Sequence, residues 1–456
     1  MKTVQLPAQT IPVLAETDVL VVDGKKTMLT GTAWADITPD QPLPLLGQMH
    51  VRLGHYTRDP LTVNAVLFAD DQQKLALVSI DVCLLPDSLV RTIQAAVAAA
   101  TGLPPTAIIL VATHTHVAPC TTSMLAGEAD PGFLQQLTQA TVDAVQRALS
   151  DLEPVTLYAG QGYLEQMGWN RRGMRRDGSC HMYWGSWKED FVGLEGPRDG
   201  AVGVIWAVKA DGQMKVVIPS FATHPNCVEG ESYYSADLPG QVRRVLRTTL
   251  GESVGVVYLT GAAANTAPSI MENNPQNQQP WRGESGLVRS GLYLGGEILK
   301  VIAGQTTPMA DPCLHHEQVE LQLPMRAWDT WADLTEFGEA MRAYFEASRA
   351  EWPTLLREDN PVPVRLHVIR LGDAAICCNP AELYVELGLA IKQRSPARVT
   401  LIAELSDGWC GYVPTPEAIR HGGYSATTNR YTRLIPEAGW LITETTQQML
   451  CRVFGF

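Results

Sequence analysis

At residues 108–116 the chain reads Ile-Ile-Leu-Val-Ala-Thr-His-Thr-His, an apolar run that leads directly into two histidines. The run is rich in β-branched residues, which predicts a buried strand over 108–113. Because side chains alternate across a strand, His114 and His116 should emerge on the same face at its end. A single histidine in this place is most often a structural residue of the core. A close pair at a strand end favours a metal ligand about as strongly as a structural role.

A third histidine follows another predicted strand. Residues 201–208 and 214–222 are apolar runs separated by Ala-Asp-Gly-Gln, which predicts a β-hairpin. The second run leads into Thr223-His224-Pro225, so that Ala-Thr-His again stands at a strand tip. Packing alone does not account for this recurrence. We therefore take His224 as the third candidate imidazole.

Glu382 is the candidate carboxylate. It follows the apolar run 374–378 and begins a predicted helix over 382–393, where an acidic residue in the first turn complements the helix dipole. A carboxylate at such a strand-to-helix corner is also a natural metal ligand. Asp81 ends another apolar run, 75–80. We expect Asp81 to serve the N-terminus of the helix that follows, and the alternative is that it orients a metal-bound imidazole.

The remaining patterns predict an α/β fold with layered, mixed β-sheets flanked by helices. The predicted strands are 63–68, 75–81, 108–113, 155–164, 201–208, 214–222, 254–259, 318–323, 362–371, 374–378 and 399–404. The predicted helices are 86–101, 133–152, 237–250 with Asp237 as N-cap, 284–303, 331–352, 382–393 and 436–454. Turn formers predict loops over 31–62 and 272–280.

The chain shows no internal repeat, low-complexity linker or break in composition, so we expect a single domain over residues 1–456. Within it, the strands at 108–113, 214–223 and 374–378 should place their ends together. With 45% hydrophobic and 18% charged residues, the composition is that of an ordinary soluble globular protein. The net charge of -13 argues against nucleic acid or an anionic membrane surface as the main partner.

Several features of the sequence indicate a cytoplasmic location. The N-terminal residues contain no apolar signal-peptide core, and no apolar run is long enough to span a membrane. The 9 cysteines include no CxxC pair, and an odd number without a secretion signal fits reduced thiols. We therefore expect a cytoplasmic protein that does not bind membranes; the sequence leaves its oligomeric state open.

Two loops are predicted to face a substrate. The first, 168–184, is basic and aromatic in an acidic protein, and the second, 409–424, is rich in glycine and aromatic residues. The first loop contains Trp169, Arg171, Arg172, Arg175, Arg176 and Trp184. A solvated charged surface is the alternative. Together the loops could form a compact pocket for an apolar group and a carbonyl or anionic oxygen.

Short motifs along the chain resemble, in their common order, the catalytic N-terminal domain of the neutral/alkaline, non-lysosomal ceramidases, which are zinc-dependent amidases. Each motif is short, and their order across residues 31–424 carries the resemblance. The motifs are Asp36-Ile37-Thr38-Pro39, Asp59-Pro60-Leu61, Ser79-Ile80-Asp81, Ala112 to His116, Asn170-Arg171, Thr223-His224, Gly261 to Pro268, Pro380-Ala381-Glu382, and Tyr412 with Tyr424.

The resemblance implies both a metal site and catalytic residues. The implied zinc ligands are His114, His224, Glu382 and Tyr412, and the residues implied to face the substrate are His116, Arg171 and Tyr424. The chain departs from the family at one turn, Gly-Asp-x-Ser-Pro, which here reads Ala264-Asn265-Thr266-Ala267-Pro268. The enzymes that cleave ceramide are exported and carry a further C-terminal β-domain. Because neither feature is visible here, we expect a small soluble amide, lactam or ester as substrate.

The implied chemistry is hydrolysis by metal-activated water. Zinc lowers the pKa of a bound water to about 7, which supplies a nucleophile near neutral pH. Arg171 or Tyr424 would stabilise the oxyanion, and His116 would relay a proton to the leaving amine or alcohol. Tyr412 would either coordinate the metal or donate to the oxyanion.

Two other functions remain as alternatives. Two histidines and one carboxylate also describe the facial triad of iron(II) enzymes, although a tyrosine ligand and the order of the motifs favour zinc. A non-catalytic binding protein on the same scaffold is the second alternative, because the turn at 264–268 lacks the family's Asp and Ser.

Overall fold

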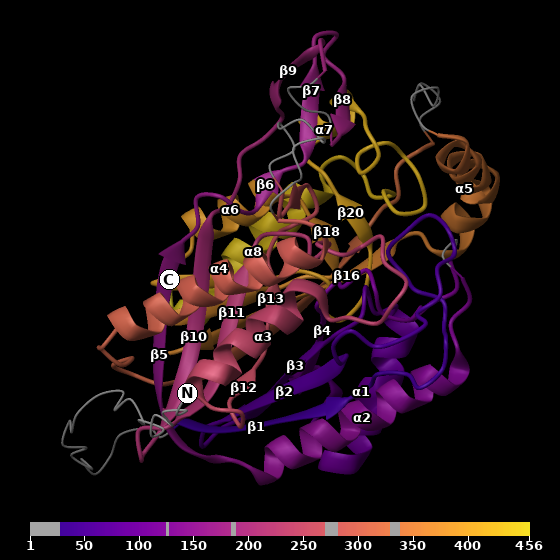
Figure 1. Ribbon diagram of the computed structural model, residues 1–456. Coiled ribbons are helices and arrows are strands. Elements are labelled where there is room, and N and C mark those ends of the chain that lie inside the picture. Colours follow the sequence, from indigo (N-terminus) through magenta and orange to yellow (C-terminus); the bar gives the residue numbers. More distant parts are fainter. Residues whose placement is uncertain (1–27, 125–126, 184–187, 270–280, 329–337) are drawn as a thin grey trace, which may run out of the picture.

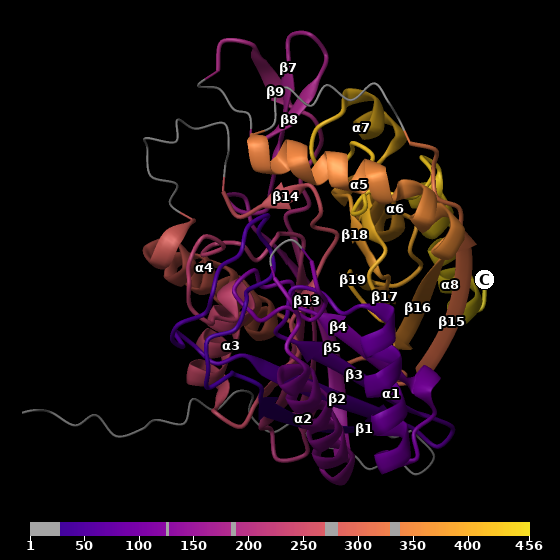
Figure 2. The ribbon, with the colours of Figure 1, turned by 90° about the vertical axis from the view of Figure 1, so that its right-hand side faces the viewer.

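In the computed structural model two β-sheets pack face to face, and helices cover the outer face of each sheet (Figures 1 and 2). The structure describes residues 28–124, 127–183, 188–269, 281–328 and 338–456. This four-layered arrangement confirms the predicted α/β class with mixed sheets. Among the described helices, none combines the length and the apolar character needed to cross a membrane.

The larger sheet has the strand order β12-β11-β10-β5-β1-β2-β3-β4, and β13 pairs with β11. Its strands are β1 Met28–Asp36, β2 Thr62–Ala69, β3 Lys74–Ile80, β4 Ile108–Ala112, β5 Glu153–Tyr163, β10 Ala201–Lys209, β11 Met214–Phe221, β12 Gly255–Val256 and β13 Leu259–Thr260. The helices on its outer face are α1 Asp87–Thr101, α2 Pro131–Ser150, α3 Asp237–Leu250 and α4 Gly283–Gly304.

The smaller sheet has the order β15-β16-β17-β19. Its strands are β15 Leu314–Leu323, β16 Val362–Leu371, β17 Ala374–Cys378 and β19 Val399–Ala403. Helices α6 Val385–Gln393 and α8 Ala438–Phe454 pack on its outer side, and α5 Glu339–Glu358 adds apolar side chains to the same hydrophobic cluster from beyond the sheet (Figure 2). The apolar side chains between the two sheets form a separate cluster.

Strand β4 shows why buried strands of the two sheets are continuous apolar runs in the sequence. Ile108, Leu110 and Ala112 point toward the helices, whereas Ile109 and Val111 point toward the smaller sheet. Both faces of β4 are therefore buried, and no polar position interrupts the run. The same alternation holds in β17, where Ala375 and Cys377 face the outer helices and Ile376 faces the larger sheet.

Short strands connect the sheets to the loops above them. β18 Ala381–Leu383 pairs in parallel with β20 Gly411–Val413, and β14 Thr266–Ala267 pairs with β6 Trp169–Asn170. β7 Arg172–Arg175, β8 Cys180–Met182 and β9 Phe191–Leu194 form a small sheet that projects at the top of Figure 1, near the short helix α7 Pro416–His421.

Several predicted elements are corrected by the structure. Strand β1 occupies part of the segment 31–62 that we predicted as loop. The predicted strand 254–259 is two short strands, and the predicted helix 382–393 begins only at Val385. Asp237 is not an N-cap: the cap position is Ala236, and Asp237 itself has a φ of 50°. The predicted loop 272–280 and residues 331–337 of a predicted helix lie outside the described residues, and the helix that follows is α5.

Strand β13 links the ends of three other strands. β13 runs parallel to the end of β11, and Thr260 on β13 donates a hydrogen bond from Oγ1 to the Thr113 carbonyl, just after β4, at 2.8 Å. Glu404, just after β19, donates its backbone N–H to the Thr260 carbonyl at 3.0 Å. Although β4 and β11 lie far apart in strand order, their carboxyl ends therefore meet.

Candidate metal centre

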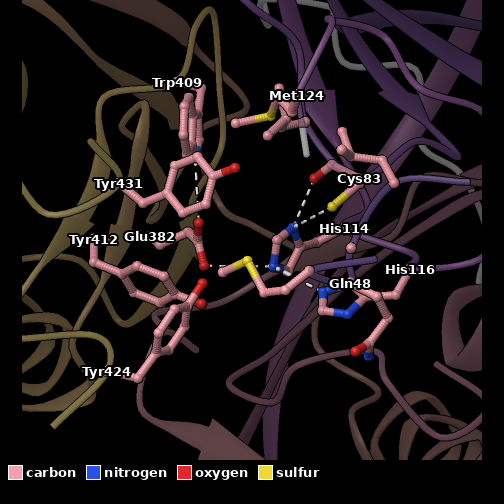
Figure 3. Close-up of a pocket in the computed structure, with 14 residues that line it drawn as sticks. Gln48, Cys83, His114, His116, Met124, Glu382, Trp409, Tyr412, Tyr424 and Tyr431 are labelled. Carbon is pink, nitrogen blue, oxygen red and sulfur yellow. Dashed lines mark hydrogen bonds and ion pairs between the residues drawn. The ribbon is translucent and has the colours of Figure 1, made fainter. Parts of the chain in front are cut away.

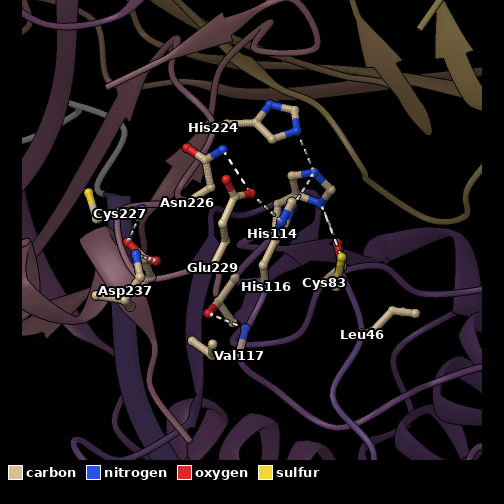
Figure 4. Close-up of polar contacts among 12 residues, drawn as sticks. Leu46, Cys83, His114, His116, Val117, His224, Asn226, Cys227, Glu229 and Asp237 are labelled. Carbon is tan, nitrogen blue, oxygen red and sulfur yellow. Dashed lines mark hydrogen bonds and ion pairs between the residues drawn. The ribbon is translucent and has the colours of Figure 1, made fainter. Parts of the chain in front are cut away.

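Strand ends bring three candidate ligands together, as Figures 3 and 4 show in part. His114 follows β4, His224 follows β11, and Glu382 lies on β18, which follows β17. The Nε2 atoms of His114 and His224 lie 3.0 Å apart. Glu382 Oε2 lies 3.6 Å from Nε2 of His114 and 3.7 Å from Nε2 of His224. All three side chains are buried.

Two predictions about local structure at these ligands were wrong. Strand β4 ends at Ala112, and His114 has a φ of 69°, so a tight turn rather than strand alternation directs its imidazole. A positive φ is unfavourable for a residue with a Cβ atom, and such strain is concentrated at functional sites. Glu382 lies on β18 and not in the first turn of a helix, so it has no role at a helix terminus.

Backbone carbonyls orient the two imidazoles. His114 Nδ1 lies 2.6 Å from the Cys83 carbonyl oxygen, and His224 Nδ1 lies 2.7 Å from the Ala263 carbonyl oxygen. Because a carbonyl only accepts hydrogen bonds, each Nδ1 carries a proton, and a neutral ring then presents an unprotonated Nε2. Burial and the Arg171 guanidinium lower the pKa of His224 well below its ordinary value, which favours the neutral ring. Metal-bound histidines are oriented in this way.

The converging atoms fit a tetrahedral cation. Glu382 Oε2 is buried without a hydrogen-bond partner among the described residues, and it lies within 3.7 Å of the Nε2 atoms of both histidines. Two ligands of a tetrahedral zinc ion, each about 2.0 Å from it, lie about 3.3 Å apart, which is close to the separations observed here. His114, His224 and Glu382 therefore form a group that could hold a metal ion. Cys83, His114 and His116 form a second group that overlaps with it.

Arg171 places a buried guanidinium beside His224. Its Nη2 lies 3.1 Å from His224 Nε2, and its Nη2 and Nε donate to the Ala264 carbonyl at 2.5 and 3.1 Å. Its Nη1 donates to the Tyr183 hydroxyl at 3.2 Å. Burial alone would lower the pKa of Arg171, but Tyr183 and Tyr412 raise it above its ordinary value. Arg171 thus holds a fixed positive charge at the edge of the ligand cluster.

His116 lies between the ligand cluster and a carboxylate. Its Nε2 is 3.4 Å from Nε2 of His114, and its Nδ1 is 3.3 Å from Glu229 Oε2 (Figure 4). Burial, followed by His114 and Arg171, lowers the pKa of His116 well below its ordinary value. The ring is therefore placed where it can exchange a proton with a group bound at the cluster.

Tyr412 and Tyr424 complete the set of predicted site residues. Tyr412 lies on β20, and its hydroxyl accepts a hydrogen bond from Arg171 Nη2 at 3.4 Å. The Tyr424 ring stands edge-on to the Tyr412 ring, with 5.6 Å between their centroids. Burial and then Glu382 raise the pKa of Tyr412 well above its ordinary value, and burial and then Tyr431 do the same for Tyr424. Both hydroxyls are thus donors near neutral pH.

A cavity of about 60 Å³ opens next to these groups. Its polar wall includes His114, His116 and Glu382, and its apolar wall includes Met49, Met124, Trp409 and Tyr431 (Figure 3). Trp409 Nε1 also donates to Glu382 Oε1 at 3.2 Å. The other carboxylate oxygen, Oε2, faces the imidazoles. The predicted aromatic loop 409–424 does line a compact pocket at the ligand cluster.

Few residues of the basic loop 168–184 contact the site. Arg172 is buried in an ion pair with Glu195, and Arg175 pairs with Asp190 in the projecting small sheet. Arg176 donates to the Glu189 carbonyl. Of the arginines that we predicted to face the substrate, only Arg171 contacts the ligand cluster, because the chain turns into β7 immediately after it. Trp184 lies outside the described residues.

Asp81 neither caps a helix nor contacts an imidazole. Its carboxylate accepts hydrogen bonds from the Thr62 backbone N–H at 2.8 Å and the Thr113 hydroxyl at 3.1 Å, and it forms an ion pair with Arg243. The N-cap of α1 is Pro86. Both interpretations of Asp81 were therefore wrong: it joins β2 and α3 to the end of β4, and the Cys83 carbonyl orients His114.

The turn that departs from the ceramidase pattern supports Arg171. The Asn265 carbonyl accepts the Arg171 backbone N–H at 2.8 Å, and Asn265 Oδ1 accepts the Val385 N–H at 2.8 Å. Asn265 Nδ2 donates to Glu386 Oε2 at 2.9 Å, and Ala267 is buried in β14. Asn265 thus connects Arg171 to the N-terminal end of α6.

The carbonyl groups of Cys83, Ala263 and Ala264 are functional groups that sequence reasoning missed. They hold His114, His224 and Arg171, and every residue has a carbonyl, so no residue pattern marks these three. The small residues of the turn 261–264 were a partial signal, because they allow the backbone to approach other groups closely. Glu229 was likewise not singled out.

The fold and the site together define a layered α/β protein with a candidate metal centre where strand ends meet. The sequence matches no protein-family model and no curated protein sequence. The structure is similar to neutral ceramidase from Pseudomonas aeruginosa, with a TM-score of 0.76 and 16% sequence identity over 94% of this chain and 75% of that one. It is also similar to a ceramidase complexed with C2, with a TM-score of 0.76 and 14% identity over 94% of this chain and 76% of that one. The chain therefore has the fold of neutral ceramidase, which confirms the predicted resemblance at the level of fold.

Proposed function

We propose that this protein is a zinc-dependent hydrolase that cleaves an amide, lactam or ester bond of a small soluble substrate, and that residues 1–456 form one hydrolase domain. The observation that carries the proposal is the convergence of two imidazole Nε2 atoms and the unpartnered Glu382 Oε2 beside a cavity, among the residues that the structure describes. The likeness in fold to a ceramidase, an amidase, supports the same reaction class.

In this proposal His114, His224 and Glu382 hold the metal, with Tyr412 next to it. Zinc bound there would lower the pKa of a water molecule to about 7 and polarise a substrate carbonyl. The Arg171 guanidinium and the Tyr424 hydroxyl would bind the oxygen on which negative charge develops, because both are preorganised donors in a buried site. His116 would give a proton to the leaving amine or alcohol.

The shape of the site supports a small substrate. The cavity beside the ligands has a volume of about 60 Å³, and side chains such as Met124, Trp409 and Tyr431 surround it. These apolar and aromatic side chains suit an apolar acyl or cyclic group next to the ligands. A cytoplasmic location remains part of the proposal: no disulfide joins any of the nine cysteines, and eight of them are buried.

Two measurements on the same purified protein test the proposed function: its metal content and a screen of substrates. Protein purified without added metal should contain about one zinc ion per chain and should hydrolyse at least one small N-acyl amine, lactam or ester. A chelator should abolish turnover, and zinc should restore it. Iron as the bound metal would favour the facial-triad alternative, and absence of turnover across the screen would favour a binding protein. Long-chain ceramide cleaved faster than every small amide would contradict the proposed substrate class.

His116→Ala tests the proton relay. We expect this variant to keep its zinc and to lose about 10²–10⁴-fold in kcat, the usual contribution of a general acid or base. Zinc content after dialysis and kcat are measured on the same preparation. Because Nε2 of His116 lies 3.4 Å from Nε2 of His114, a loss of zinc from this variant would instead make His116 a ligand.

A further inference from the structure

Two consecutive residues, Glu404 and Leu405, contact the backbone beside all three candidate ligands. Glu404 Oε2 accepts the N–H groups of Ala263 and Leu383, each at 3.0 Å. The Leu405 N–H donates to the Ala381 carbonyl at 3.3 Å, and its carbonyl accepts the Ala112 N–H at 3.1 Å. The segments before His114, around Glu382 and beneath His224 are thus joined at one corner after β19.

The two hydrogen bonds to Glu404 act directly on the geometry of the ligands. The Ala263 carbonyl accepts the proton on Nδ1 of His224, and Leu383 is the residue after Glu382. A single oxygen atom binds both backbone N–H groups, so the two segments cannot separate without breaking one of the bonds. Glu404 is fully buried, so water cannot readily replace a broken bond.

This arrangement carries costs that simple packing would not require. Glu404 Oε1 is buried and has no hydrogen-bond partner among the described residues. Leu405 and Asp407 have φ values of 56° and 53°, in the region that strains residues with a Cβ atom. Strained backbone of this kind persists only where the surrounding structure holds it in place, and it is concentrated at functional sites.

We propose that Glu404 is a positioning residue of the metal centre, which sets the separation between Nε2 of His224 and Oε2 of Glu382 through the backbone of Ala263 and Leu383. This inference rests on the proposed metal-binding function. Glu404 does not contact the metal or the substrate in this proposal; it acts through its two backbone partners.

Zinc affinity of Glu404 variants, measured by competition with a chromogenic chelator, tests the proposal without an activity assay. Glu404→Ala and Glu404→Asp should bind zinc about 10–100-fold more weakly than the wild type, because the first lacks the acceptor and the second is too short to reach both N–H groups. Glu404→Gln should stay close to the wild-type affinity, because its amide oxygen can accept both bonds.

Glu297→Ala is the matched control. Glu297 is also a buried carboxylate that accepts one backbone N–H, from Tyr163 at 2.8 Å, but it lies on α4 outside the metal centre. Its loss should lower the thermal stability and leave zinc affinity unchanged. A general loss of stability would weaken zinc binding equally in both alanine variants.

The outcomes separate this inference from the proposed function. If the wild type does not bind zinc, the proposed function and this inference both fail. If the wild type binds zinc, and the folded Glu404→Ala and Glu404→Asp variants bind zinc as tightly as the wild type does, the inference alone is overturned. An equal loss of affinity in Glu297→Ala would also overturn it. If Glu404→Ala does not fold, the Glu404→Asp variant, which keeps the carboxyl group, decides the question.

Discussion

His114→Ala, His224→Ala and Glu382→Ala are each expected to lose the metal while the protein stays folded. Each substitution removes one of the three atoms that converge within 3.7 Å of one another. The segments that position them follow strands of the two packed sheets, so a metal added to this preformed scaffold need not be structural. Turnover should fall by about 10³-fold or more, because the lost Lewis acid supplies several kcal/mol of transition-state stabilisation.

Metal content after dialysis, circular dichroism and thermal unfolding check this expectation together. His316→Ala is the control, because His316 lies on β15 of the smaller sheet, contacts His367 at 3.0 Å and is not one of the converging ligands. The control should keep both metal and activity. Full zinc occupancy in all three ligand variants would show that the assignment of the ligands is wrong.

Arg171→Ala is expected to lower kcat by about 10²–10³-fold with little change in KM. The Ala264 carbonyl and the Tyr183 hydroxyl hold the guanidinium in place before substrate binds, so its charge meets the oxyanion without reorganisation. Arg171→Lys should retain only part of the rate, because an ammonium group cannot reproduce the fork that bonds Ala264 and Tyr183 at the same time.

Separate measurement of kcat and KM distinguishes this role from simple substrate binding. Arg175→Ala is the control, since Arg175 comes from the same basic loop but pairs with Asp190 in the projecting sheet. It should leave both constants unchanged. A large rise in KM at unchanged kcat for Arg171→Ala would show that Arg171 only anchors the ground-state substrate.

Much of the fold was predictable because local pattern and tertiary burial agree. The predicted boundaries of β16 and β17 match the structure, because both strands are largely buried and a tight turn separates them. The hairpin of β10 and β11 follows the predicted turn. Strand β1 was missed because its buried positions are interrupted by partly exposed ones and turn formers follow it.

The side chains of the candidate site could be predicted from the sequence, but the backbone groups that hold them could not. His114, His224 and Glu382 were selected because they follow apolar strands, and the structure brings them to one point. The resemblance supplied Arg171, Tyr412 and Tyr424, which also lie there. Their roles in binding metal and in catalysis remain predictions.

The sequence by itself determined the layered α/β class and the residue types that reach the strand ends, because periodicity and side-chain chemistry are local properties. Only the tertiary structure decided which backbone carbonyls hold His114 and His224, and that Glu404 joins the segments around them. Only the tertiary structure showed that Arg172 pairs with Glu195 and not with the site, and that Glu382 lies on a strand. The physical reason is that hydrogen bonds to the backbone and contacts between distant segments depend on three-dimensional proximity, which no single stretch of residues encodes.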